Sequence, residues 1–288
     1  MGFFKLLFGG QDATPEEERQ GADSRNFDLL KYDGVKALRM GQADYAAKCF
    51  REALKIHDDL EVRDYLSQAL IRTGELADAL RELKLIAAAQ PQNMAAYVQA
   101  AHVAYMMEDY AEQQAICEQA LQVDDTFAPL WQQYALAARG QGRLDEAVAR
   151  LTKAIELDDQ LADARLLRGQ VLLQKGDTAG ATADADWLND FVGEHEDVLL
   201  LQARIAHAEG RDDDAISIYN KVNDLNPFQL DAFRERGRIY YDRGDSAAAE
   251  DEMRKLLELN PSELGDGEPE SVEKMMQRAY QPINPFGI

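Results

Sequence analysis

The sequence is poor in residues that reactive sites commonly use. Its 288 residues include only two cysteines, Cys49 and Cys117, and four histidines. Both cysteines lie among apolar residues without a metal-type partner nearby, so we interpret them as small buried hydrophobic side chains. So few cysteines fit a reducing, cytoplasmic compartment, where structural disulfides are rare.

Basic residues are scarce relative to acidic residues. The chain has 31 Lys and Arg against 53 Asp and Glu, which gives a formal net charge of −22. A charge of this sign repels nucleic acids and anionic lipids, so we expect no general nucleic-acid binding. It favours solubility and basic partners.

Long apolar runs are also missing. No segment approaches the roughly 20 consecutive apolar residues that a membrane-spanning helix needs. The N-terminal segment Met1–Phe8 is apolar but too short for a secretory signal, and Leu6 stands where a myristoylation signal requires Ser or Thr. A peripheral membrane contact through Met1–Phe8 remains an alternative.

No recognised catalytic or cofactor motif is present. None of the histidines belongs to a His-Glu-x-x-His array or lies beside a plausible nucleophile: His57, His102, His195 and His207. The segment Gly140–Asp145 begins like a dinucleotide loop but lacks the third glycine and a preceding strand. The acids around Asp184 lack the Gly and Glu of a calcium loop, so we interpret them as a solvated helix face. We therefore expect a protein that is not an enzyme and needs no cofactor or metal.

What the sequence does contain is a repeat of about 34 residues. Glycines recur at intervals of 33, 68, 34, 34 and 34 residues, with Glu108 in the skipped position: Gly41, Gly74, Gly142, Gly176, Gly210 and Gly244. A small residue follows five positions later, except at Gln113: Ala46, Ala79, Ala147, Ala181, Ala215 and Ala249. Another small residue lies seven positions before: Gly34, Ser67, Ala101, Ala135, Gly169, Ala203 and Gly237. Glycine permits a tight left-handed turn, and small residues let two antiparallel helices approach closely.

These columns resemble the tetratricopeptide repeat family. The best match is the fourth repeat, with Trp131, Ala135, Gly142, Leu144, Ala147, Leu151 and Ala154. The resemblance implies an all-α, right-handed α-solenoid of seven helical hairpins plus a C-terminal capping helix. It places the repeats within 27–263, at 27–59, 60–93, 94–127, 128–161, 162–195, 196–229 and 230–263.

The two ends differ from the repeats. Residues 1–26 comprise the apolar segment and a polar linker over 9–26, and residues 264–288 comprise a second linker, a capping helix and a proline-containing tail. The capping helix is predicted from one apolar stripe at helical spacing, formed by Val272, Met275, Met276, Ala279 and Tyr280. Repeat arrays need such a cap over their last exposed face.

The resemblance also predicts a peptide-binding groove, because the first helices of such hairpins line a concave surface. We expect its residues to be Lys31, Arg39, Arg72, Arg139, Leu166, Leu167, Leu200, Leu201, Arg204, Arg234, Arg238 and Tyr241. Arginines between leucines predict an extended ligand with alternating acidic and apolar side chains, bound across repeats four to seven. In the alternative, the arginines only pair with the rim acids Asp163, Asp197 and Asp231.

The predicted function is a non-catalytic protein-protein interaction scaffold that binds an extended peptide or a partner helix. The family's chaperone-binding clamp is not expected, because Val35 and Tyr65 stand where it requires asparagines. The alternatives are a membrane-peripheral assembly or secretion factor recruited through Met1–Phe8, and an unrecognised enzyme. The partner, the pathway and the oligomeric state are left open.

Overall fold

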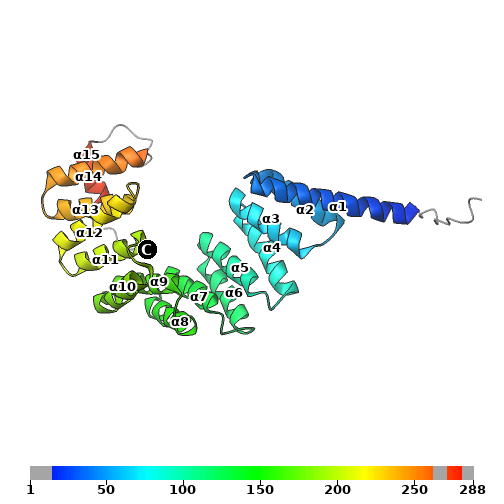
Figure 1. Ribbon diagram of the computed structural model, residues 1–288, viewed down its shortest axis with the longest axis horizontal. Coiled ribbons are helices and arrows are strands. Elements are labelled where there is room, and N and C mark those ends of the chain that lie inside the picture. Colours follow the sequence, from blue (N-terminus) through cyan, green and yellow to red (C-terminus); the bar gives the residue numbers. More distant parts are fainter. Residues whose placement is uncertain (1–14, 262–270, 281–288) are drawn as a thin grey trace, which may run out of the picture. The chain divides into compact units, whose positions relative to one another are not determined.

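The fold was obtained as a computed structural model, which describes residues 15–261 and 271–280. This part of the chain forms α-helices connected by short turns, without a β-strand (Figure 1). The helices divide into two compact units, with unit 1 ending at Asp125 and unit 2 beginning at Thr126. None of the described helices is both long enough and apolar enough to cross a membrane.

Unit 1 contains three helical hairpins. Each helix packs against the next one along the chain: α1 (Pro15–Arg39), α2 (Ala43–Ile56), α3 (Leu60–Thr73), α4 (Leu76–Ala89), α5 (Met94–Met106) and α6 (Tyr110–Leu121). The first helix of each hairpin is odd-numbered and the second is even-numbered.

Unit 2 contains four hairpins and an additional helix. Its elements are α7 (Ala128–Gly140), α8 (Leu144–Leu157), α9 (Ala162–Gln174), α10 (Thr178–Val192), α11 (Glu196–Ala208), α12 (Asp212–Leu225), α13 (Leu230–Asp242), α14 (Ser246–Leu259) and α15 (Val272–Ala279). Consecutive helices again pack in order, and α9 also contacts α11, so the first helices of neighbouring repeats lie side by side. The all-α fold of stacked helical hairpins that the repeat predicts is confirmed, and the described residues hold three hairpins in unit 1 and four in unit 2.

The glycine column forms the turns inside the hairpins. All six of its glycines have φ between 73° and 81°, the left-handed region that a side chain disfavours. Glu108 adopts the same conformation, with φ of 57°, in the hairpin where glycine is missing. The turn geometry is therefore kept even where the sequence departs from the pattern.

The small-residue columns lie where the paired helices meet. Ala46, Ala147 and Ala215 are fully buried. A Cβ atom added to Gly169 would lie 2.8 Å from Cδ2 of Leu201, and one added to Gly34 would meet the ring of Phe50 at 2.5 Å. These columns are small because any larger side chain would push two helices apart.

The predicted capping helix is present as α15. Met276 and Tyr280 are buried in a cluster with Phe233 of α13 and with Met253 of α14. The Tyr280 ring also lies against Gly237, where an added Cβ would run into the hydroxyl group. This helix covers the apolar face of the last hairpin, as a terminal cap should.

Two sequence expectations are corrected. The polar linker over 9–26 is wrong for residues 15–26, which belong to α1; proline suits the first turn of a helix, and acids suit its N-terminus. Asp184 is not on a solvated face. It is buried, and its carboxylate receives two hydrogen bonds from Arg168 at 2.6 and 2.8 Å.

Candidate protein-interaction surface

Arg204 is the predicted groove residue whose environment differs most from expectation. Its guanidinium on α11 forms a forked pair with the Glu235 carboxylate on α13, at 2.6 to 3.0 Å. The Tyr219 hydroxyl of α12 donates a 2.7 Å hydrogen bond to the same carboxylate. Burial lowers the pKa of Arg204, but the hydrogen bonds and charge of Glu235 outweigh it and raise the pKa above its ordinary value. Arg204 therefore links repeats six and seven, and its fork is occupied.

Three of the four predicted groove leucines belong to the core. Leu167, Leu200 and Leu201 are buried, and Leu201 lies against the Gly169 position of the preceding repeat. These three fill the space between adjacent hairpins, so little of their surface is open to a groove ligand, and their role in ligand binding stays a prediction. Leu166 is half-buried on α9.

The other predicted residues of unit 2 lie at the ends of the array. Nη1 of Arg234 lies 2.8 Å from a carboxylate oxygen of Asp231, and Nε of Arg238 lies 3.6 Å from one of Asp242. Tyr241 packs against the cap, with its ring centroid 5.6 Å from that of Tyr280. Arg139 is half-buried at the end of α7. Pairing with a rim acid is thus observed at Asp231.

Two of the three predicted cations of unit 1 contact neighbouring residues. Nζ of Lys31 on α1 donates a 2.7 Å hydrogen bond to Glu61 on α3 and lies 3.6 Å from Asp59. The Lys31 hydrogen bond lowers the pKa of Glu61, and the same contact raises the pKa of Lys31. Arg72 donates a 3.0 Å hydrogen bond to the carbonyl oxygen of Leu38, whereas Arg39 is exposed.

The first helices of unit 1 expose side chains that those of unit 2 do not. Tyr32 of α1 is 67% exposed and Met106 of α5 is 43% exposed. On α5 the rings of His102 and Tyr105 stack with centroids 6.4 Å apart. On α3, Tyr65 is half-buried and stacks on Phe50 at 5.7 Å. The sequence places these residues on the first helices, but their exposure depends on neighbours that it does not reveal.

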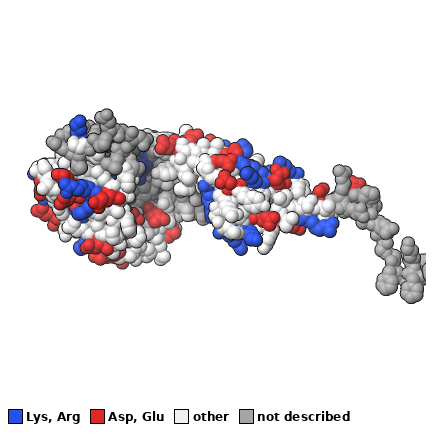
Figure 2. Space-filling view, turned by 90° about the horizontal axis from the view of Figure 1, so that it is seen from above, with Lys and Arg blue, Asp and Glu red and all other residues white. Residues whose placement is uncertain are grey.

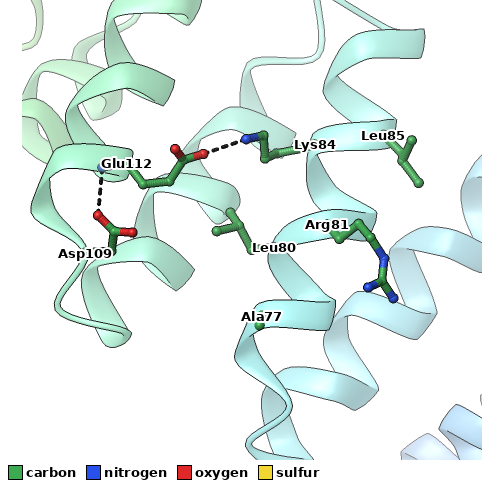
Figure 3. A pocket seen from close by; sticks show the side chains of 7 residues that line it. All are labelled: Ala77, Leu80, Arg81, Lys84, Leu85, Asp109 and Glu112. Carbon is green, nitrogen blue, oxygen red and sulfur yellow. Dashed lines mark hydrogen bonds and ion pairs between the residues drawn. The ribbon is translucent and has the colours of Figure 1, made fainter.

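Two of the hollows in unit 1 lie between helices of successive repeats. One, of about 390 Å³, lies between the starts of α3 and α5 and is lined in part by Glu61, Asp64 and Gln99. The other, of about 470 Å³, lies between the second helices α4 and α6 (Figure 3). There Lys84 reaches across to Glu112 at 2.6 Å, above Leu80 and Ala77. The ion pair of Lys84 and Glu112 bridges the hollow between α4 and α6. The hollow of about 390 Å³ instead lies beside the first helices α3 and α5.

Comparisons with known proteins agree with this architecture. A TPR repeat family matches residues 136–176, and a tetratricopeptide repeat family matches residues 234–263. A tetratricopeptide repeat protein from Parabacteroides merdae superposes with a TM-score of 0.73, over 89% of this chain and 100% of that chain, at 13% sequence identity. The chain thus contains tetratricopeptide repeats.

Two further proteins resemble this chain, one in sequence and one in fold. Human DnaJ homolog subfamily C member 3 is 26% identical over 220 residues, which are 71% of this chain and 44% of that protein. The chain thus matches less than half the length of this relative. PilW, described as a widely conserved type IV pilus biogenesis factor, superposes with a TM-score of 0.59 at 16% identity, over 70% of this chain and 94% of PilW. At this identity the second likeness concerns the fold alone.

The surface charge of the described residues is of both signs. Acidic and basic side chains both appear on the visible face, and no patch of one sign covers it (Figure 2). Many of the cations are paired with acids of a neighbouring helix, as for Lys31 and Arg204. The predicted basic groove floor is therefore largely neutralised by its own neighbours. Met1–Phe8 lie outside the described residues, so membrane recruitment through them stays a prediction.

Proposed function

We propose that the chain is a non-catalytic scaffold that binds an extended peptide or a partner helix over the first helices of unit 1. The single observation that supports this most is the set of exposed aromatic, Met and Arg side chains on α1 and α5. These residue types are enriched in protein interfaces, where their large side chains bury a large contact area.

The binding face is defined by side chains on three first helices: Tyr32 and Arg39 of α1, Tyr65 and Gln68 of α3, and Gln99, His102, Tyr105 and Met106 of α5. Tyr32 and Met106 supply apolar contact, while Gln99 and His102 are exposed and offer hydrogen bonds. The hollow of about 390 Å³ beside Gln99 has room for a side chain of the ligand. A ligand with aromatic or apolar side chains between amide-rich segments suits this face.

This proposal moves the ligand away from repeats four to seven. Gripping an acidic peptide there would require Arg204 to leave Glu235, which would strand a carboxylate that also accepts the Tyr219 hydroxyl. Breaking a partly buried pair in this way is costly, because the remaining charge loses its partner. The exposed residues of unit 1 need no such rearrangement.

The test measures peptide affinity after removing exposed side chains from the proposed face and, as a control, from a second helix. Peptides are selected from a random display library on the whole protein, and their affinities are then measured for Tyr32→Ala, Met106→Ala and Tyr45→Ala proteins. Tyr45 lies on the second helix and is 53% exposed, so it is a matched control for Tyr32. We expect the first two variants to weaken binding about tenfold, because losing a contact of about 1.4 kcal/mol changes the affinity by this factor.

The three variants should have the same melting temperature as the wild-type protein, since exposed side chains contribute little to stability. Selected peptides that bind all three variants equally well would refute the first-helix face of unit 1 as the binding site. A loss confined to Tyr45→Ala would place the site on the second helices instead.

A further inference from the structure

The exposed apolar side chains of unit 2 are confined to one edge of its array. Within the described residues of this unit, the large exposed apolar residues are Phe191, Val192, Leu225, Phe228 and Leu259. They occupy the C-terminal ends of α10, α12 and α14 and the turn after α12. Phe228 is 73% exposed, Leu225 is 53% exposed and Phe191 is 49% exposed. We call these five residues the apolar edge.

The edge follows the repeat. Phe191, Leu225 and Leu259 are spaced 34 residues apart, and the half-buried Leu157 occupies the same position one repeat earlier. Equivalent positions of stacked repeats form a row along the array. Contacts between successive turns agree with this: Nδ2 of Asn226, after α12, donates a 2.9 Å hydrogen bond to Glu196 at the start of α11. The apolar edge therefore follows the turns that join successive repeats.

Part of the edge is held in a fixed orientation. The Phe191 ring stacks on Trp187 with centroids 4.5 Å apart, and the Arg165 guanidinium covers Trp187 at 4.0 Å. A ring fixed by its neighbours loses little further freedom when a partner covers it. The same stacking brings an indole close enough to report on binding at Phe191.

An acid directly precedes each apolar residue of the row. Glu156, Asp190, Asp224 and Glu258 are all exposed. The structure records no ion pair between any of them and a cation of the described residues. The last turns of α8, α10, α12 and α14 also hold no basic residue. An acid beside a helix C-terminus opposes the helix dipole, at roughly 0.3–1 kcal/mol, so these acids do not serve helix stability.

We propose that the apolar edge is a docking surface for a basic amphipathic segment of a partner protein. The large apolar side chains of the segment pack on Phe191, Leu225 and Phe228. Its Lys and Arg side chains pair with the acids of the row and with the carbonyl groups at the helix ends. Anionic membrane and a second copy of this acidic chain both bring negative charge to the row, so neither matches it. This surface is separate from the face proposed on unit 1.

The experiment uses the whole protein and a fluorescein-labelled peptide of Lys and Leu in an amphipathic helical pattern. A Glu and Leu peptide of the same pattern measures the role of charge. Fluorescence anisotropy gives the dissociation constant. In a Trp131→Phe protein, where Trp187 is the remaining tryptophan, the Trp187 emission reports contact near Phe191. We expect the Lys and Leu peptide to bind and to shift the Trp187 emission, and we expect the Glu and Leu peptide not to bind.

Two sets of variants then locate the binding. A Phe191→Ser, Leu225→Ser protein should bind roughly tenfold more weakly, whereas Tyr45→Ser, Leu85→Ser in unit 1 should leave binding unchanged. An Asp190→Asn, Asp224→Asn, Glu258→Gln protein should bind more weakly and with less dependence on salt. Its control changes three acids of unit 1: Asp28→Asn, Asp44→Asn and Glu108→Gln.

The outcomes separate the explanations. Equal losses for both triple variants would mean that the peptide senses only net charge, and would overturn the proposal. Full binding by Phe191→Ser, Leu225→Ser, or equal binding of the Glu and Leu peptide, would overturn it too. Because Tyr32 and Met106 are untouched in the unit 2 variants, failure here leaves the proposed function of unit 1 unaffected.

Discussion

At the scale of single residues, chemical type did not decide the role of a side chain. Arg204 and Arg39 were both assigned to a ligand-binding floor, yet Arg204 holds Glu235 while Arg39 is exposed. Leu201 and Leu225 are both leucines of repeat six, yet the first is buried and the second is 53% exposed. In each pair, the side chains of the neighbouring repeat decide whether the residue is paired, buried or exposed.

Glu108 offers a direct test of the turn geometry. Its φ of 57° lies in the left-handed region, where an L-residue with a side chain is disfavoured by about 1–2 kcal/mol. We expect Glu108→Gly to stabilise the protein by about 1 kcal/mol, partly offset by the greater freedom of glycine in the unfolded chain. Urea denaturation measures this change. Gly142→Glu, at the equivalent turn, should destabilise, and the same sign for both variants would contradict the argument.

At the scale of helices, repeats five and seven each contain the same kind of polar contact, which we call a clasp: an arginine of the first helix that binds an acid of the second helix and a polar side chain of the preceding repeat. In repeat five, Arg168 of α9 binds Asp184 of α10 and donates a 3.1 Å hydrogen bond to Thr152 of α8. In repeat seven, Arg236 of α13 binds Glu252 of α14 at 2.5 Å and Asn220 of α12 at 2.8 Å. Each clasp joins the two helices of a hairpin to the second helix of the preceding repeat.

The clasp predicts a large effect for one substitution. Arg236 and Glu252 are both buried, so Arg236→Ala leaves a buried carboxylate whose remaining cation is the exposed Lys255 at 3.3 Å, and should destabilise by about 3 kcal/mol. Replacing both residues by Met should recover most of this loss, because no uncompensated charge then remains. The exposed pair of Arg243 and Asp213 is the control, and Arg243→Ala should leave the unfolding free energy nearly unchanged because solvent screens an exposed pair. Equal losses at the two arginines would show that the clasp adds nothing.

At the scale of the whole molecule, the cap completes unit 2. Removing residues 264–288 should expose Phe233 and Met253, which α15 now helps to bury. An exposed apolar face at the end of a repeat array promotes self-association. We expect the truncated protein to sediment as concentration-dependent oligomers and to melt below the intact chain. A truncated protein that stays monomeric and equally stable would contradict this role for α15.

A single substitution distinguishes the effect of losing the packing of α15 from the effect of losing the rest of residues 264–288. Tyr280→Ala removes the ring that fills the space beside Gly237 and leaves the chain length unchanged. Removing a buried aromatic side chain typically destabilises by about 3–5 kcal/mol. If the truncation acts through α15, this variant should reproduce part of the lower melting temperature.

The regular hairpins followed from the sequence, because the glycines and small residues that form them act within one repeat. The site did not, and neither did the clasp: a buried acid such as Asp184 looks like a surface residue until Arg168 is seen opposite. The early start of α1 was also missed, because a polar segment with acids suits a helix N-terminus as well as a linker.

The sequence alone determined the period, the number of hairpins and the cap, since each depends on residues close together in the chain. The tertiary structure decided which side chains remain available to a partner. Lys31 meets Glu61 and Arg204 meets Glu235, partners that lie 30 and 31 residues away. Contacts between neighbouring repeats thus neutralise the predicted groove and leave other residues exposed, and that selection depends on how each hairpin packs on the next.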